Sequence, residues 1–510
     1  MEKLNHLFDN IPLPYDYVIF PSPNEPHAPK IPGMFYYVNR AITGITRRAF
    51  IHGGLTQSAT FNRWNASWGR QYEAPQYNKC LSWQKINHFA GAFLMGRKDD
   101  FHQRMEELKE RDPEIATFYP ESYLLPKNNE EFREVFYQRT TWIYKPYASA
   151  RGNGIELIKS IDAKDIPIKR GIYQVYIEKP LLITKRKFDL RLYVMVTSVN
   201  PLIIYMHENG MARFATHEYV EDASISDLQM HLTNFSLNKD DDSFIMSSGK
   251  EIIQNSKWSI QFFLDYLEKQ GIDVKQLMKK IEKVVIASFI AGMTTVREHH
   301  FNCIKHRHTS YELYGVDVIL DQDLNPYIME INISPSMDTT GSKLDREIKF
   351  PLLIDTLNKA RIIKCNSKSK DPCPSIASLD ILWRKSMSEE RVKDVVNNKV
   401  DPWENPVFAD FTFIRDFLEE NKIPTKYRRV YPKRKTMSMF SKCFSRKLYS
   451  DIVFQKWIEM SMEKRYEVIE KSFATYQNTM DQLIRPEKNE KPFVVNLIEN
   501  AEIQQKETCL

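Results

Sequence analysis

The segment that most constrains the fold is residues 315–336, GVDVILDQDLNPYIMEINISPS. Apolar residues recur at every second position on both sides of the polar stretch 321–326, which predicts two strands joined by a turn. Side chains alternate between the faces of a strand, so Glu330 and Asn332 share a face, and Asp317 joins them if the strands pair. Two carboxylates and a carboxamide suit Mg²⁺, which leaves coordination positions for phosphate oxygens. Considered alone, an exposed hairpin face explains this segment equally well.

A second segment, residues 142–159 (WIYKPYASARGNGIELIK), predicts a strand, a flexible loop and another strand. Lys145 ends the first strand, and the loop contains Arg151, Gly152 and Gly154. Glycines allow backbone N–H groups to close on an anion, and the two basic residues add charge. The loop is not a P-loop, because no GKS or GKT follows, and it lacks the GxGxxG of a dinucleotide fingerprint. A plain hairpin turn is the alternative.

Two more segments carry polar residues in a regular pattern. Residues 171–180 (GIYQVYIEKP) predict a strand, and in KRKFDLR the residues Lys187, Asp189 and Arg191 share one face of the next strand. Such residues can hold phosphate and ribose, or they can form a surface ion-pair ladder of little energetic value. HLTN at residues 231–234 either belongs to the same site or caps a helix or turn. The four segments in this order indicate one site, although each signal alone is weak.

Together these motifs resemble those of the tubulin tyrosine ligase-like family, whose members are ATP-grasp amino-acid ligases. The resemblance rests on Lys145-Pro146, the SARGNG loop, Gln174 with Tyr176-Ile177, KFDLR, HLTN and the D…ME-I-N-x-SPS ending. It also includes HGGLTQSATFNRWNASWG, KINHFAGAFLMGRKD and FYPESYLLP, and so spans roughly residues 45–360. The motifs are closer to the polyglutamylating branch than to the tyrosinating or glycylating branches.

The resemblance implies a role for each residue of the site. Nucleotide contacts are implied for Lys145, Arg151, Gly152, Gly154, Gln174, Tyr176, Ile177, Lys187 and Asp189. The implied catalytic residues are Arg191, Arg213, Asn234 and Glu330, with both arginines on the γ-phosphate and acyl-phosphate and Asn234 near the nucleotide and acceptor. The implied magnesium ligands are Asp317, Glu330 and Asn332. ATP and Mg²⁺ are therefore the expected cofactors.

The implied reaction joins free glutamate to a glutamate side chain of an acidic tubulin tail through an acyl-phosphate. A carboxylate does not react with an amine until a leaving group is attached, and positioning with charge neutralisation can supply most of the catalysis. The sequence contains no GxSxG, and no cysteine has a recognisable nucleophile context. The alternatives are a ligase that adds glycine or modifies a non-tubulin acidic protein, and a non-catalytic microtubule-binding protein. The intact polar residues argue against the last.

Ile333 is the residue in this motif that bears on acceptor choice. In the family, ligases that extend an existing glutamate chain resemble NHSPS here, whereas those that start a branch have an aliphatic residue. A histidine can bind the extra carboxylate of an attached glutamate, and isoleucine cannot. We therefore predict a branch-initiating enzyme. The alternative is that Ile333 only packs in the core.

The predicted fold is α+β and of the ATP-grasp type, with the nucleotide between two α+β lobes and a mainly helical C-terminal region. Residues 1–60 form an N-terminal arm with a Pro-rich stretch, and residues 61–180 form the first lobe. Residues 181–360 form the second lobe with the metal site, and a helical region is predicted at 258–292. Residues 361–510 comprise a linker and amphipathic helices.

Composition bounds the class of protein. A chain of 510 residues that is 42% hydrophobic predicts a globular protein with several domains. No secretory signal and no run of about 18 apolar residues is present, so no membrane span is expected. Six cysteines without CxxC spacing fit reduced thiols. We expect a monomer in the cytoplasm and on the cytoskeleton, with the cilium or basal body as a further candidate.

Residues 426–447, KYRRVYPKRKTMSMFSKCFSRK, contain nine basic residues and no acidic one. Such a run favours an anionic partner, and a nucleic acid, an anionic membrane or an acidic tubulin tail would each fit. The family resemblance favours tubulin tails and microtubules, with Arg428, Arg429, Lys433 and Arg434 as docking residues. No RNP-type aromatic motif is present, so nucleic acid is not the expected partner. A membrane is not the expected partner either. A solvated basic loop is the alternative.

Overall fold

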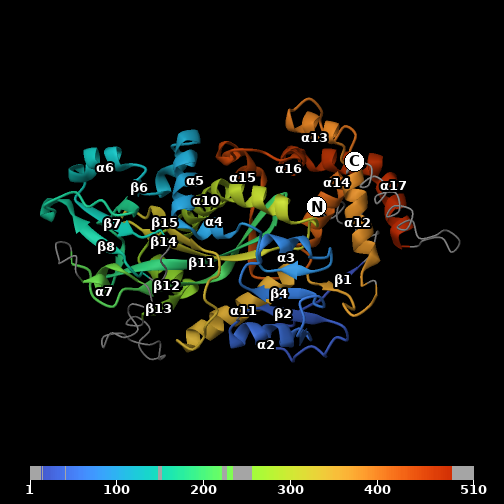
Figure 1. The fold of residues 1–510 in the computed structure, drawn as a ribbon, viewed down its shortest axis with the longest axis horizontal. Helices are drawn as coiled ribbons and strands as arrows, with labels where there is room; N and C mark the ends of the chain where they lie inside the picture. Colours follow the sequence, from blue (N-terminus) through green and yellow to red (C-terminus); the bar gives the residue numbers. More distant parts are fainter. Residues whose placement is uncertain are drawn as a thin grey trace.

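The computed structural model describes residues 13, 15–40, 42–147, 152–220, 227–233, 256–370 and 372–484. Helices and strands are mixed along these residues (Figure 1), which confirms the predicted α+β class. Arg151, Asn234 and most of the SARGNG loop lie outside the described residues. The position of a nucleotide between two lobes and the predicted domain boundaries stay predictions.

The N-terminal part contains a four-stranded parallel sheet. Its strands, in spatial order, are β3 (Thr56–Gln57), β2 (Phe35–Asn39), β4 (Ala66–Gly69) and β5 (Lys85–Ile86). Parallel neighbours need crossover connections, and α2 (Gly44–His52) and α3 (Ala74–Asn78) lie in two of them. The Pro-rich stretch 21–33 before this sheet contains no helix or strand. It leads directly into the first strand of the sheet.

A four-stranded antiparallel sheet follows and lies at one end of the molecule (Figure 1). Its strands, in spatial order, are β6 (Ser122–Leu125), β9 (Gly171–Val175), β7 (Thr141–Lys145) and β8 (Glu156–Lys159). Phe132, Trp142 and Tyr173 form a core of its own together with helix α6 (Asn129–Val135). The strands predicted around Trp142 and Tyr173 are confirmed, and they pair so that Ile143 lies opposite Gln174.

The largest sheet has seven strands and carries the second half of the predicted motifs. Its main path is β13 (Lys257–Ser259), β12 (Leu202–Phe214), β11 (Arg186–Val199), β14 (Glu312–Leu320) and β15 (Pro326–Asn332), with β10 (Leu182–Ile183) on β11 and β17 (Tyr427–Tyr431) on β12. The predicted hairpin at 315–336 is therefore confirmed as β14 and β15. Strand β14 is buried along its whole length, so an exposed hairpin does not describe it.

Long helices cover the large sheet, with α10 (Val274–Cys303) and α11 (Lys343–Ala360) on different sides of the strands in Figure 1. The predicted helical region 258–292 is in fact strand β13 followed by two helices, α9 (Ile260–Lys269) and α10. Gly271 after α9 adopts a φ of +83°, a left-handed conformation that ends helices. The Asp273 side chain then accepts from the backbone N–H of Gln276 at 3.0 Å and starts α10.

The C-terminal part is mainly helical and lies at the other end of the molecule from the four-stranded sheet (Figure 1). Its helices are α12 (Pro374–Lys385), α13 (Glu389–Val396), α14 (Phe408–Glu419), α15 (Arg434–Met439), α16 (Tyr449–Glu459) and α17 (Met462–Ile484). This part is not a separate body, because β17 pairs with β12 and one buried cluster includes both Val316 and Phe411. No helix in the described ranges has the length and apolarity needed to cross a membrane.

Candidate active site

One cavity collects most of the residues predicted to bind nucleotide and metal. It lies between the four-stranded antiparallel sheet and the large sheet, and its empty space, including the part open to solvent, is ≈ 820 Å³. The predicted residues that line it are Lys145, Gln174, Tyr176, Ile177, Lys187, Asp189, Asp317 and Glu330. They come from sequence positions far apart, so the fold brings the separate motifs together.

Lys145 stands at the end of β7 and is held in place by a short chain of hydrogen bonds. Its Nζ donates to Oε1 of Gln174 at 2.7 Å, and Nε2 of Gln174 donates to Oγ of Ser122 at 2.8 Å. Burial lowers the pKa of Lys145 to about 8, and nearby Glu330 offsets this only in part. Gln174 therefore orients the lysine, and a bound anion would stabilise its charged form.

Lys187, on β11, is a second buried lysine in the same cavity. Its Nζ donates to the hydroxyl of Tyr176 at 2.8 Å, and that hydroxyl lies 2.8 Å from Nδ1 of His231. Burial and the positive charge of Lys145 together lower the pKa of Lys187 to about 7, and Asp189 offsets this only in part. Two cations that disfavour each other in one cavity indicate a site for a highly charged anion, such as a chain of phosphates.

Alternating acids and arginines lie side by side on three neighbouring strands. Asp189 and Arg191 are on β11, and the register places them opposite Arg213 on β12 and Asp317 on β14 respectively. Arg191 Nε donates to Asp317 Oδ1 at 2.5 Å, and Arg213 Nε donates to Asp189 Oδ1 at 2.6 Å. Arg213 Nη2 also lies 3.0 Å from Asp317 Oδ2. These residues are largely buried, so a surface ion-pair ladder is the wrong description.

The charge of Asp317 is secured by this arrangement. Burial alone would raise the pKa of Asp317, but Arg191 and Arg213 outweigh burial and lower that pKa to about 2. The carboxylate is therefore ionised at any physiological pH. It also holds the two guanidinium groups at fixed positions beside the cavity.

The predicted magnesium ligands meet on the paired strands β14 and β15. Asp317 lies opposite Glu330 in the register, and Nδ2 of Asn332 lies 3.3 Å from Oδ2 of Asp317. Among the described residues, no three His, Cys, Asp or Glu side chains form a cation site. Two carboxylates and one amide oxygen nevertheless fit Mg²⁺, which uses few protein ligands and completes its shell with water and phosphate oxygens. The donor set thus fits this ion in combination with a nucleotide.

Ile333 does not line this cavity. Strand β15 ends at Asn332, and the half-buried Ile333 lines a neighbouring cavity together with Arg70, His88 and Ser336. It also packs against the main core and approaches Gly96, where an added Cβ would lie 3.2 Å from its Cγ2. Ile333 is therefore partly a core residue and partly a cavity wall.

The predicted docking residues lie on β17 and at the start of α15, so a solvated loop is the wrong description. The carboxylate of Glu282 on α10 forms ion pairs with Arg428 Nη1 at 2.7 Å and with Lys433 Nζ at 3.5 Å. Arg429 is half-buried, with its guanidinium 3.5 Å from the centre of the Phe417 ring. Arg434 is exposed. The candidates for docking are thus Arg428, Lys433 and Arg434, whereas Arg429 packs against Phe417 within the protein.

Sequence reasoning did not assign three residues that the structure places at this site. Ser122 holds Gln174, His231 contacts Tyr176, and Thr233 Oγ1 donates to Asp189 Oδ2 at 2.7 Å. The signal was present, because Ser122 stands in FYPESYLLP and the other two in HLTN. Thr233 serves this contact, while the N-cap of the short helix α7 (Leu228–His231) is Asp227.

Comparisons with known proteins identify relatives of this chain. The model of the tubulin-tyrosine ligase family matches residues 76–370. Tubulin polyglutamylase ttll-4 of Caenorhabditis elegans is 33% identical over 407 aligned positions, and the match covers 76% of this chain and 66% of the relative. Tubulin monoglutamylase TTLL4 of Mus musculus is 35% identical over 59% of this chain and 26% of the relative. Tubulin polyglutamylase TTLL5 of Homo sapiens is 36% identical over 60% of this chain and 24% of the relative.

Proposed function

This chain belongs to the tubulin-tyrosine ligase family, and we propose that it is an ATP- and Mg²⁺-dependent ligase that attaches free glutamate to a glutamate side chain of a tubulin tail. The observation that carries the proposal is the single cavity lined by Lys145, Lys187, Asp317 and Glu330. Cations for phosphate and oxygen ligands for magnesium meet there, which is what the activation of a carboxylate requires.

Some residues of this site would bind the nucleotide and the metal, and others would stabilise negative charge on the transferred group. Lys145 and Lys187 bind phosphate oxygens, and Gln174 orients Lys145. Asp317 and Glu330, with the amide oxygen of Asn332, would hold Mg²⁺. The acceptor carboxylate would take the γ-phosphoryl group of ATP to form an acyl-phosphate with release of ADP, and the amine of free glutamate would then displace inorganic phosphate to form the amide bond and lose a proton. Arg191 and Arg213 stabilise the negative charge that develops on the transferred group.

The proposal includes the start of a branch on a genetically encoded glutamate. It is supported by Ile333, which gives the neighbouring cavity an apolar wall where a histidine would bind an additional carboxylate. Arg70 on the same cavity supplies a cation for the acidic acceptor. The names of the relatives include both monoglutamylase and polyglutamylase, so they support either step.

The experiment that tests the function is mass spectrometry of microtubules incubated with the protein, ATP and, separately, glutamate, glycine or tyrosine. Mass increments of glutamate alone support the proposal, and increments of glycine would favour a glycine ligase. The absence of any ATP-dependent increment would favour a non-catalytic microtubule-binding protein. The proposal includes a monomer that acts in the cytoplasm on the cytoskeleton, with the cilium or basal body as one location, which imaging of the tagged chain tests.

A further inference from the structure

A second cavity, remote in sequence from the candidate active site, lies where the N-terminal strands meet the C-terminal helices. Its empty space, including the part open to solvent, is ≈ 710 Å³, close to that of the candidate active site. Strands β5, β1 (Asp16–Tyr17) and β16 (Ile363–Lys364) contribute to its wall, and so do helices α12, α14 and α17. The two cavities share no lining residue among those described.

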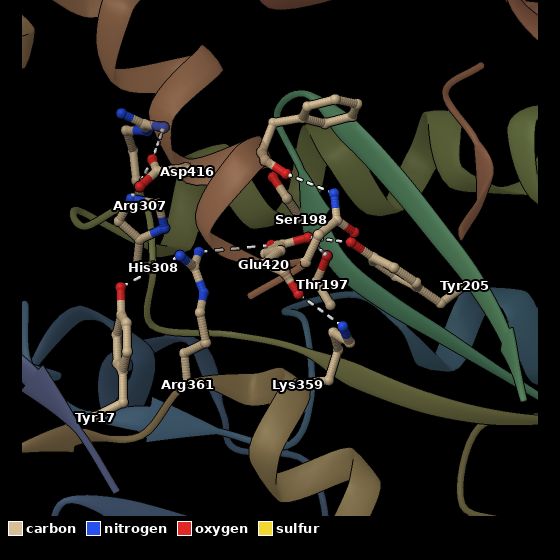
Figure 2. Close-up of polar contacts among 12 residues, drawn as sticks. Tyr17, Thr197, Ser198, Tyr205, Arg307, His308, Lys359, Arg361, Asp416 and Glu420 are labelled. Atoms are coloured by element: carbon tan, nitrogen blue, oxygen red, sulfur yellow. Dashed lines mark hydrogen bonds and ion pairs between the residues drawn. The ribbon is translucent and has the colours of Figure 1, made fainter. Parts of the chain in front are cut away.

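The wall of this cavity has an excess of positively charged side chains. Lys85, Arg307, Arg361 and Arg415 line it, whereas the acids of the lining are Asp380 and Asp416. Both acids already have cationic partners. Asp416 Oδ2 lies 3.0 Å from Arg307 Nη2 and 3.0 Å from His308 Nε2, as Figure 2 shows. Asp380 Oδ2 lies 2.6 Å from His306 Nδ1 and 3.1 Å from Arg384 Nη2.

Lys85 is the most informative of these cations. The residue is only 5% exposed, yet within the part of the chain that the structure describes its ammonium has no hydrogen bond or ion pair. Burial and the positive charge of Arg361 together lower the pKa of Lys85 to about 7, and the charges of Glu420 and Asp416 offset this only in part. A buried ammonium that makes no hydrogen bond or ion pair is costly, and a bound anion would reduce that cost.

Arg361 lies beside Lys85 in the same wall and has donors to spare. Its Nη1 donates to the Tyr17 hydroxyl at 3.2 Å, and its Nη2 lies 3.5 Å from Glu420 Oε1. Glu420 does not line the cavity, and its Oε2 accepts from the Tyr205 hydroxyl at 2.8 Å (Figure 2). A guanidinium has five N–H donors, so these contacts leave part of the group for a ligand.

The rest of the wall is largely apolar and aromatic, including Tyr15, Ile376, Leu379 and Trp383. The indole N–H of Trp383 is buried and has no hydrogen-bond partner within the described ranges. An inorganic ion alone would leave this surface uncovered. A ligand with an anionic group at one end and an apolar or planar body at the other matches both parts of the wall.

We propose that this cavity binds a small phosphate monoester, with the phosphate between Lys85 and Arg361 and the organic part against Trp383 and its apolar neighbours. A lysine supplies a point charge and an arginine a two-pronged donor, a combination suited to a doubly charged phosphate. Because the wall is built from both ends of the chain, the bound ligand would hold the C-terminal helices against the N-terminal strands. The site is additional to the proposed ligase function and does not depend on it.

Calorimetric titration with phenyl phosphate and with inorganic phosphate, at constant ionic strength and without ATP or acceptor, tests the proposal. The wild-type chain should bind phenyl phosphate more tightly than inorganic phosphate. Lys85→Met should weaken binding at least tenfold, and Lys364→Met, an exposed lysine on β16, should not. Lys187→Met alters the candidate active site and should leave this binding intact. Loss of binding in Lys187→Met instead of Lys85→Met would overturn the proposal, as would equal binding of phosphate and chloride.

A second measurement separates ligand binding from a structural role of Lys85. Competitive acylation of lysines at pH 8, followed by peptide mass spectrometry, reports the fraction of Lys85 in the neutral amine form. Phenyl phosphate should raise the pKa of Lys85 and reduce its labelling severalfold, while labelling of Lys349, which is paired with Asp345, stays constant. Lys85→Met should unfold at the same or a higher Tm without ligand. Unchanged Lys85 labelling at saturating ligand would refute the site.

Discussion

At the scale of single residues, Glu330 is the proposed magnesium ligand whose carboxylate makes no ion pair with an arginine in the described part of the chain. Asp317 is held by Arg191 and Arg213, whereas no side-chain hydrogen bond or ion pair to Glu330 occurs in the described part of the chain. Glu330→Gln removes the charge and keeps the shape. We expect glutamate ligation to fall at least 100-fold with an unchanged Tm, because the metal loses an anionic ligand.

The matched control for this variant is Glu268→Gln, an equivalent change on the exposed side of α9. Ligation rates and thermal unfolding are measured on both variants. Near-normal ligation by Glu330→Gln would remove this residue from the metal site.

Ile333 gives a prediction about the acceptor. Offered a plain tail peptide and one that carries a single branch glutamate, the wild-type chain should modify the plain peptide faster. Ile333→His should shift the preference toward the branched peptide, because a histidine at the cavity wall can bind the added carboxylate. Initial rates on the two peptides measure this preference. A wild-type chain that modifies only the branched peptide contradicts branch initiation.

Lys187 makes nucleotide affinity depend on pH. With a pKa of about 7 in the free protein, Lys187 loses its proton as pH rises from 7 to 9, and Lys145 follows with a pKa of about 8. Phosphate binds the protonated forms, so the affinity for MgATP should fall over this interval. Lys187→Met should bind more weakly at pH 7 and show a shallower pH dependence. Calorimetry at several pH values tests this, and a wild-type affinity that is constant from pH 7 to 9 would contradict it.

The same lysine affects stability with a definite sign. The unfolded state, in which lysine has a pKa near 10.4, binds more protons than the folded state between about pH 7 and 10. Stability of the ligand-free protein should therefore rise with pH across this interval as far as Lys187 is concerned. Its lowered pKa thus opposes folding at pH 7 and favours the binding of an anion.

At the scale of elements, strand β17 and the start of α15 carry both exposed basic residues, which are available for docking, and the half-buried Arg429, which contacts the core. Replacement of Arg428 and Arg434 by Glu should weaken microtubule binding more than it reduces the rate of ligation to a free tail peptide. Microtubule binding by the wild-type chain should weaken as the salt concentration rises, because exposed charges are screened within about 10 Å at 0.1 M. Arg429→Glu should instead lower Tm, because it removes the contact with Phe417. Co-sedimentation with microtubules measures the first effect and calorimetry the second. Equal losses of microtubule binding and of ligation to the free tail peptide would argue against docking.

The elements also show which features the sequence could predict. The hairpin of β14 and β15 follows from alternating apolar residues and a turn, which are local signals. The pairing of Arg191 with Asp317 was not predictable, because the register of strands 126 residues apart depends on the whole sheet. Strand β17 was missed because Tyr427, Val430 and Tyr431 are interrupted by charged residues, and only its pairing with β12 makes it a strand. The site residues were found through motifs, and Ser122 was not assigned because the motif that contains it, FYPESYLLP, does not indicate a role for the serine hydroxyl.

At the scale of the whole molecule, the buried core continues from the large sheet into the C-terminal helices. Phe411, Val430 and Phe454 belong to the same cluster as Leu192 and Val316. Removal of residues 374–510 would also expose an edge of β12 that β17 covers. We expect this truncated chain to lose cooperative unfolding in calorimetry. A truncated chain that unfolds cooperatively at the Tm of the full chain would contradict a shared core.

Strand β12 connects the two functional regions proposed for this chain. It pairs with β17 through residues 204–207 and carries Arg213 of the candidate active site near its other end. Met206 and Arg213 lie opposite Val194 and Asp189 of β11, and five residues of a strand span about 17 Å. If β17 docks on the microtubule, β12 fixes the distance between the docking point and Arg213. The acceptor glutamate is then selected by its distance from the docking point. Lengthening or shortening the tail should therefore move the position of modification, although the residues around each glutamate stay the same.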